Sequence, residues 1–380
     1  MINFDTAATT PVYKECREII DRYSFDLFYN PSARYKQAVS VAMDVRRARE
    51  SLAKLMGVQK EEIFYTSSGT EADNWAVFGT VKRQEQGFVC SATEHSAVYN
   101  VAKELKNRGH NVTFVPVLSD GSVDVDALVS AVDESVALVS IMHVNNETGA
   151  VNDLAKITSL IKKKSPKTLV HSDGVQAFGK IPVNVSKLGV DMYTVSGHKI
   201  HAPKGIAALY VKKGTRLQPY IFGGGQEGGM RSSTENVAGI VALTKAAEIL
   251  CAKTASVREK NTAISRYIAD SIGKKYGDRF RLNTNLDNFS GSILNFSING
   301  IMGEVLLHSL ETEGILISTG SACSTKKGIS RIPKELGLSE GFAKGTVRIS
   351  LSDESTMLEA EEFVQKCTKI VDGLLNFRKK

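Results

Sequence analysis

The stretch "TLVHSDGVQAFGKIPVNVSKLGVDMYTVSGHKIHAPKGIAALYV" (residues 168–211) decides the fold class. It contains three short apolar segments, and glycine or proline lies close to the ends of each: 168–173, 191–196 and 206–211. Apolar runs of this length between turn residues are typical of buried strands. Two of the three end in polar groups, namely Asp173 and the run from Ser196 to Lys199. We therefore expect strands that deliver a carboxylate and a lysine to the same place.

Similar segments precede this stretch. Further strands are predicted at 62–67, 87–92, 112–117 and 136–144. Segments with helical periodicity, such as 71–84 and 96–109, lie between most of them. Alternation of strands and helices predicts an α/β fold, in which helices cover a mostly parallel sheet of seven strands.

The C-terminal part follows a different pattern. A glycine-rich segment (222–233) precedes a helical pattern over 235–274, and short strands are predicted after it at 291–298, 314–319 and 345–352. This order indicates a smaller α+β domain, as expected for a chain of 380 residues. The predicted division is an N-terminal segment that packs with the small domain (1–15), a large domain (16–250) and the small domain (251–380).

Composition restricts the class of protein. Apolar residues make up 42% and charged residues 23%, which is typical of a globular protein in water. A run of 18 apolar residues is absent, and residues 1–15 do not resemble a secretory signal, so we expect no membrane segment. The five cysteines are scattered without metal-ligand spacing, which favours a reducing compartment and a cytoplasmic protein.

The net charge of +7 raises the alternative of nucleic-acid binding. The short basic runs at 162–164 and 378–380 contain no aromatic residues on which bases could stack. Solvated surface charge explains them equally well, so we expect no nucleic-acid partner.

Polar residues follow five of the predicted strands. They lie at 67–70, 93–95, 145–147, 173–176 and 196–199. In an open α/β sheet, ligands bind outside the carboxyl ends of the strands. Because these five positions share one edge, the sequence predicts a ligand site there.

Three of these groups together indicate a cofactor. Desolvation lowers the pKa of a lysine such as Lys199, and a neutral amine can form a Schiff base. Asp173 could pair with a pyridinium nitrogen, and the turn at 67–70 before a helix could bind a phosphate. Each has a simpler alternative, because Asp173 could form a salt bridge and Ser68 or Thr70 could cap the helix. The combination matches pyridoxal phosphate (PLP).

Three further residues are candidates for chemistry. His95 follows a strand end and could stack on the cofactor or carry a proton, although a structural histidine is the commoner case. Cys323 lies in "STGSACSTKKGIS", where two lysines would lower the pKa of its thiol. Arg348 could grip a carboxylate, cover the sheet or pair with an acid. Cys90 is expected in the strand core, and Cys16, Cys251 and Cys367 lie in helical patterns.

The chain resembles cysteine desulfurases of the NifS/IscS type, within the class V aminotransferase group of fold-type I PLP enzymes. The matching motifs include "FDTAATTP", "TSSGTEADN", "TEHSAV", "HVNNETG", "SDGVQAFGK", "SGHKIHAPKG", "GGGQEGGMRSSTEN", "STGSACS" and "VRISLS". The chain departs from the family pattern at "RYKQAV", where a histidine is expected, at Gly174, where alanine is more frequent, and at Ser233, where glycine is usual.

The resemblance implies a role for each matching residue. Lys199 would carry PLP as a Schiff base, Asp173 would pair with the pyridine nitrogen and His95 would stack on the ring. Cys323 would accept sulfur as a persulfide. The other implied cofactor contacts are Gln176 at the ring oxygen, Gly69, Thr70, Ser196 and His198 at the phosphate, and Thr234 from the second subunit of a homodimer. Asn146 and Arg348 would hold the carboxylate of the L-cysteine substrate.

The implied reaction converts L-cysteine to L-alanine and leaves its sulfur on Cys323. A sulfur-acceptor protein of iron–sulfur cluster assembly or of a thiolation pathway would then take the sulfur. The alternatives are another class V activity, such as an aminotransferase or a selenocysteine lyase, and a protein that binds the cofactor without catalysis. A thiol on a loop distinguishes the desulfurase, because transamination needs none.

Overall fold

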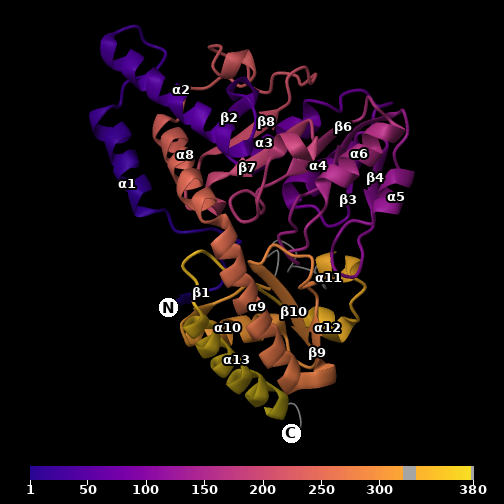
Figure 1. Cartoon of the computed structure of the whole chain (residues 1–380). Helices are drawn as coiled ribbons and strands as arrows, with labels where there is room; N and C mark the ends of the chain where they lie inside the picture. The colour runs from indigo at the N-terminus through magenta and orange to yellow at the C-terminus, as the bar shows by residue number, and fades with distance from the viewer. Residues whose placement is uncertain (320–330, 378–380) are drawn as a thin grey trace.

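The computed structural model describes residues 1–319 and 331–377 (Figure 1). Its main sheet has seven strands in the order β2-β8-β7-β6-β5-β3-β4. The strands are β2 (Ile63–Thr66), β3 (Gly87–Ser91), β4 (Val112–Val115), β5 (Val136–Ser140), β6 (Leu169–Asp173), β7 (Met192–Ser196) and β8 (Ala207–Val211). Only β8 runs against its neighbours, β2 and β7. The predicted α/β class with a mostly parallel sheet is confirmed.

The reversal of β8 explains where Lys199 lies. Strands β7 and β8 pair in register from Met192 opposite Val211 to Ser196 opposite Ala207. The chain between them is short, and the amide of Gly197 donates to the carbonyl of Ile206 at 3.0 Å. Residues 197–206 therefore form a tight connection at the carboxyl end of β7, with Lys199 inside it.

Helices cover both faces of this sheet. The side chains of each strand point alternately to one face and the other, so both faces carry apolar residues that must be covered. Val89 faces the cluster formed with α2, α5, α6 and α8, whereas Phe88 and Cys90 face α3 and α4. This confirms Cys90 as a core residue. The helices of this domain are α1 (Lys14–Asp21), α2 (Lys36–Met56), α3 (Gly69–Phe78), α4 (Ser96–Asn107), α5 (Val125–Ser130), α6 (Leu154–Lys164), α7 (Val185–Leu188) and α8 (Val237–Ala252), with a π-turn at Arg22–Asp26 after α1.

A second core lies below the first in Figure 1. It joins the antiparallel sheet β12-β10-β9 to α9, α10 and α13, and it includes Phe4, Ile268 and Phe363. Strand β1 (Ile2–Asn3) pairs in parallel with β11 (Ile315–Leu316), so the N-terminus lies in this unit. The remaining elements are β9 (Phe280–Leu282), β10 (Ile293–Ile298), β12 (Thr346–Ser350), α9 (Thr254–Tyr276), α10 (Gly303–Thr312), α11 (Arg331–Glu335), α12 (Glu340–Lys344) and α13 (Met357–Phe377).

The separate cores support the division at residues 15 and 250, which we retain as a proposal. One difference concerns the helical pattern at 235–274, which is two helices. They meet at Lys253, whose backbone (φ −117°, ψ 8°) leaves the helical range. The hydroxyl of Thr254 then donates to the carbonyls of Leu250 and Gly179. Helix α9 begins at Thr254 and runs from the large unit into the small one (Figure 1).

Two predictions from the sequence were a reducing compartment and the absence of a membrane segment. Cys16, Cys90, Cys251 and Cys367 form no disulfide among the residues that the structure describes. Within the same residues, every helix is too short or too polar to cross a bilayer.

Gly174 departs from the family pattern for a packing reason. A Cβ atom added at this residue would overlap the ring of Tyr193. That ring is fully buried, and its hydroxyl lies 2.8 Å from Nδ1 of His143.

We expect Gly174→Ala to lower the free energy of unfolding by about 1–3 kcal/mol, the usual cost of overpacking a core. Tyr193→Val opens the space that the methyl group needs. The cost of the alanine should therefore largely disappear in the double variant, as measured by urea unfolding of all four proteins. An equal cost in both backgrounds would contradict the overlap.

Candidate active site

A cavity of about 530 Å³ lies at the carboxyl ends of the sheet strands. Its lining includes residues from all five predicted strand ends, together with the N-terminal segment and β12. The predicted site residues in it are Gly69, Thr70, His95, Asn146, Asp173, Gln176, Ser196, His198, Lys199 and Arg348. The fold thus brings ten of the residues selected from the sequence into one space.

Lys199 ends a single 3₁₀ turn, Gly197–Lys199, directly after β7. Its ammonium group donates to the carbonyl oxygens of Ala7 at 2.7 Å and Ala8 at 2.6 Å. Burial, and then the charge of Arg348, lowers the pKa of Lys199 to about 8, although Asp173 and Asp5 act in the opposite direction. A useful fraction of the amine is therefore neutral and nucleophilic near neutral pH.

Asp173 ends β6 and is 4% exposed. Its Oδ1 accepts a hydrogen bond from the amide of Val175 at 2.9 Å. Burial raises the pKa of Asp173, and the charges of His95 and Lys199 partly offset this effect. A cationic ring nitrogen beside this carboxylate would supply the missing counter-charge.

His95 is the N-cap of α4, and its Nδ1 accepts from the amide of Ala97 at 3.2 Å. That bond leaves Nε2 as the nitrogen that carries the proton in the neutral ring. The surrounding protein lowers the pKa of His95 by desolvation, even though the ring keeps contact with the open cavity. A neutral imidazole with this tautomer can pass on its Nε2 proton, and it accepts a proton at Nδ1 only by giving up the bond to Ala97.

The turn before α3 caps the helix and also lines the cavity. Ser68 caps the helix, because its hydroxyl accepts from the amide of Glu71 at 3.1 Å. Gly69 and Thr70 nevertheless line the cavity. A Cβ atom at Gly69 would lie 3.1 Å from Cγ2 of Val175 and 3.4 Å from Cβ of Ser196, so the glycine permits a close approach of the segments around a ligand. Helix N-termini of this kind bind anions.

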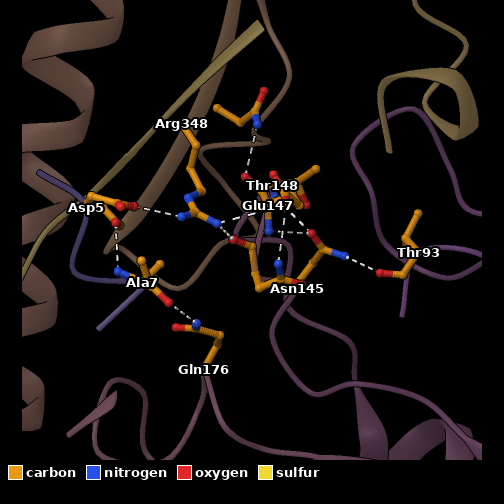
Figure 2. A network of polar contacts seen from close by, with 12 residues as sticks. Asp5, Ala7, Thr93, Asn145, Glu147, Thr148, Gln176 and Arg348 are labelled. Atoms are coloured by element: carbon orange, nitrogen blue, oxygen red, sulfur yellow. Dashed lines mark hydrogen bonds and ion pairs between the residues drawn. The ribbon is translucent and has the colours of Figure 1, made fainter. Parts of the chain in front are cut away.

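Arg348 also lines the cavity, and polar contacts of the protein hold its guanidinium (Figure 2). Its Nη2 contacts Oδ1 of Asp5 at 2.8 Å and its Nη1 donates to the carbonyl of Asn146 at 2.9 Å. Its Nε is buried without a hydrogen-bond partner. The arginine is therefore fixed by the protein, and its guanidinium has further N–H groups besides the two that bond Asn146 and Asp5.

Gln176 is also held in one orientation. Its side-chain amide donates to the carbonyl of Ala7 at 2.9 Å (Figure 2), and its Oε1 accepts from Nζ of Lys180 at 2.5 Å. Desolvation lowers the pKa of Lys180 to about 7, and the charges of Lys199 and Arg348 add to the effect.

Of the two remaining predicted residues, one lies elsewhere and the other is not described. Thr234 lines a different, smaller cavity together with Glu227 and Arg231. Cys323 lies outside the described residues. A groove of about 930 Å³ between α10 and α13 is larger than the main cavity, but none of the predicted residues lines it.

Known proteins are similar to this chain over nearly its whole length. The family model "Aminotransferase class-V" matches residues 2–363. The chain belongs to the class V aminotransferase family. It is 37% identical to a cysteine desulfurase of Nostoc sp., covering 98% of this chain and 94% of that protein. It is 34% identical to the cysteine desulfurase IscS of Dictyoglomus turgidum, with 98% and 95% covered.

Solved structures are also similar to this chain. A NifS-like protein superimposes with a TM-score of 0.92 at 33% identity, covering 98% of this chain and 99% of that one. A structure described as SspA in complex with cysteine has a TM-score of 0.82 at 31% identity, with 92% and 99% covered.

The sequence did not reveal two parts of this class V site. Residues 5–8 line it through Asp5, Ala7 and Ala8, although the N-terminal segment was expected only to pack with the small domain. Ala7 and Ala8 contribute carbonyl oxygens, which leave no signal in side-chain chemistry. Asp5 is acidic, but only its ion pair with Arg348 identifies it.

Asp73 is the second part of the site that the sequence did not reveal. It is 1% exposed, its Oδ1 has no hydrogen-bond partner, and it approaches Asp173 and His95 to within 4.8 Å. Nε2 of His171 lies 3.5 Å from it. Burial, and then the charge of Asp173, raises the pKa of Asp73 well above its usual value.

The raised pKa predicts how Asp73 affects stability. The folded chain holds this proton more tightly than the unfolded chain, so the wild type loses stability as the pH rises from about 4 toward the folded pKa. Asp73→Asn cannot titrate. We expect its free energy of unfolding to gain on the wild type by up to about 1.4 kcal/mol per pH unit in this window.

Urea unfolding of the cofactor-free protein between pH 5 and 7 measures this difference. Asp270→Asn, at an exposed position of α9, is the control and should keep the wild-type pH dependence. Parallel curves for Asp73→Asn and the wild type would show that Asp73 is ionised in the folded protein.

Proposed function

We propose that this protein is a PLP-dependent cysteine desulfurase, which converts L-cysteine to L-alanine and takes up the sulfur as a persulfide on Cys323. The observation that carries the proposal is the cavity that unites Lys199, Asp173 and the N-terminus of α3 with Arg348. The relatives named above are cysteine desulfurases, and they match over nearly the whole chain.

The chemistry of the cavity fits PLP. Asp173 is a buried carboxylate in need of a cationic partner, and the depressed pKa of Lys199 makes its amine available to an aldehyde. The helix N-terminus at Gly69 and Thr70, with Ser196 and His198 in the same lining, offers donors for a phosphate. Gln176 faces the cavity close to Lys199, where it could contact the ring oxygen.

Bound PLP would supply an electron sink for carbanion chemistry at Cα of the substrate. Lys199 would hold it covalently and, once released, would take the Cα proton. His95 would stack on the ring and move the proton of the substrate thiol. Arg348 and Asn146, which both line the cavity, would hold the substrate carboxylate.

Sulfur transfer would involve Cys323. Its thiolate would attack the substrate sulfur, so that an S–S bond forms while the C–S bond of cysteine breaks. The carbon skeleton keeps the electron pair of the C–S bond, takes up a proton and leaves as L-alanine. The persulfide would then pass to an acceptor protein of iron–sulfur cluster assembly or of a thiolation pathway.

We further propose a cytoplasmic homodimer. The unpaired described cysteines suit a reducing compartment. Phe25, Phe28 and Phe222 expose 75%, 66% and 82% of their surface, as expected for residues that a second subunit covers. Thr234 lies outside the main cavity, which agrees with a role toward the partner's phosphate site.

The test is an assay of alanine and sulfide on the purified, PLP-loaded protein with L-cysteine and a reductant. Equal amounts of both products support the desulfurase. A yellow protein that forms neither, yet exchanges amino groups with a keto acid, is an aminotransferase instead.

Cys323→Ser should keep the yellow cofactor but lose persulfide and sulfide formation by at least about a hundredfold, because the nucleophile is gone. Cys251→Ser is the matched control, since Cys251 lies in α8 away from the cavity. Sulfide release at the wild-type rate in Cys323→Ser would remove Cys323 from the mechanism.

Lys199→Ala should bind PLP without a covalent bond and should turn over L-cysteine at less than about a thousandth of the wild-type rate, since both the tether and the base are lost. Borohydride reduction followed by mass spectrometry checks the tether. A reduced adduct on another lysine of the variant, with activity retained, would move the role away from Lys199.

A further inference from the structure

Lys180 is a lysine beside the cavity that the proposed mechanism does not use. It follows Gln176 by four residues, in a turn with the hydrogen bonds of a helix, where the amide of Ile181 donates to the carbonyl of Ala177 at 3.0 Å. Side chains four residues apart on such a turn are neighbours. Nζ of Lys180 accordingly donates to Oε1 of Gln176 at 2.5 Å.

Attraction between opposite charges does not explain the position of Lys180. Burial, and then the charges of Lys199 and Arg348, lowers the pKa of Lys180 to about 7. Both of these neighbours are cations, so they repel the ammonium group rather than hold it. The hydrogen bond of Lys180 goes instead to Gln176, a neutral side chain that lines the cavity.

The two ends of the Gln176 amide are distinguished by their partners. Its Nε2 donates to the carbonyl oxygen of Ala7 at 2.9 Å (Figure 2), and a carbonyl oxygen can only accept. The N–H end must therefore face Ala7, so that Oε1 faces Lys180. This arrangement holds for a charged or a neutral lysine, because the amine carries N–H donors in both forms.

Lys199 shares an acceptor with Gln176. Its amine donates to the same Ala7 oxygen at 2.7 Å, so the amide and the amine lie side by side against one carbonyl group. The amide of Ala7 donates to the hydroxyl of Ser350 at 2.8 Å, which fixes this residue. Because Gln176 presents its N–H end at this point, it offers the amine of Lys199 no acceptor.

We propose that Lys180 is a positioning residue, which holds the oxygen of Gln176 away from Lys199 and so keeps the Lys199 amine available to an aldehyde. The inference rests on the proposed role of Lys199 and deepens it. Gln176 is 5% exposed, so without Lys180 its oxygen would be buried without a partner. Rotation of the amide by half a turn would then place Oε1 beside the amine, which would donate to it and be held back from the aldehyde.

The test measures how fast the amine of Lys199 reacts in the full chain without cofactor. Formaldehyde with cyanoborohydride methylates accessible lysines, and peptide mass spectrometry follows Lys199 separately. We expect Lys180→Met to slow methylation of Lys199 about three- to tenfold, the effect of one additional hydrogen bond. Lys187, an exposed lysine of α7, is the internal reference and should react equally fast in every protein.

A second background separates positioning from charge. Loss of the positive charge of Lys180 would by itself favour the protonated, unreactive form of Lys199. That effect does not need Gln176, whereas the proposed one acts through its amide. Lys180→Met should therefore slow methylation less than about twofold in Gln176→Leu protein. Equal slowing in both backgrounds overturns the proposal, and so does an unchanged rate in Lys180→Met alone.

Two further variants complete the series. Lys180→Arg keeps the charge and the N–H donors, and it should retain at least about half of the wild-type rate. Lys180→Ser is too short to reach Gln176, and it replaces Lys180→Met in both backgrounds where that variant does not fold.

The rate at which the cofactor-free protein captures PLP, followed by visible absorbance, is a second readout. It should fall by the same factor in Lys180→Met, whereas Lys187→Met should leave it unchanged. Methylation involves neither PLP nor cysteine, so a wild type that forms no alanine rejects the proposed function and leaves the test of Lys180 intact. Unchanged methylation of Lys199 in Lys180→Met, with a wild type that does form alanine, rejects only the role of Lys180.

Discussion

The amine of Lys199 is buried at the end of β7, where Ala7 and Ala8 offer it only neutral carbonyl oxygens. Burying an ammonium group without a directly bonded carboxylate disfavours its charge, and the pKa of Lys199 falls to about 8. Neighbouring charged groups also act on this amine. Arg348 lowers the pKa of Lys199 further, and its own charge is balanced by Asp5 at 2.8 Å.

The carboxyl groups of the cavity differ in their ion pairing and in their burial. Asp5 is paired with a cation, whereas Asp73 and Asp173 are buried and lie close together, next to the exposed ring of His95. Burial, and then the neighbouring carboxyl of Asp173, raises the pKa of Asp73, because two close buried carboxyls resist simultaneous ionisation. Of these two, Asp173 is the one whose pKa the charges of His95 and Lys199 lower again.

The N-terminal segment joins the two units of the fold. Strand β1 pairs with β11 in the small domain, residues 5–8 line the cavity, and Tyr13 stacks on His201. These contacts make the Lys199 turn depend on both units. The contacts of residues 2–13 therefore hold Arg348 on β12 and Lys199 after β7 relative to one another.

The seven strands, the helices between them and the edge of the sheet at which the cavity lies could be predicted from the sequence. The reason is that strand and helix periodicities and the polar ends of strands are local signals, which is why Asp173, Lys199 and His95 could be selected correctly as cavity residues. Only the tertiary structure decided what those groups face. Asp5 is separated from Arg348 by 343 residues, Asp73 is distinguished by its burial, and Asp353 after β12 meets His201 after β7. Burial and contacts between distant segments set the charge of each group, and they exist only once the chain is packed.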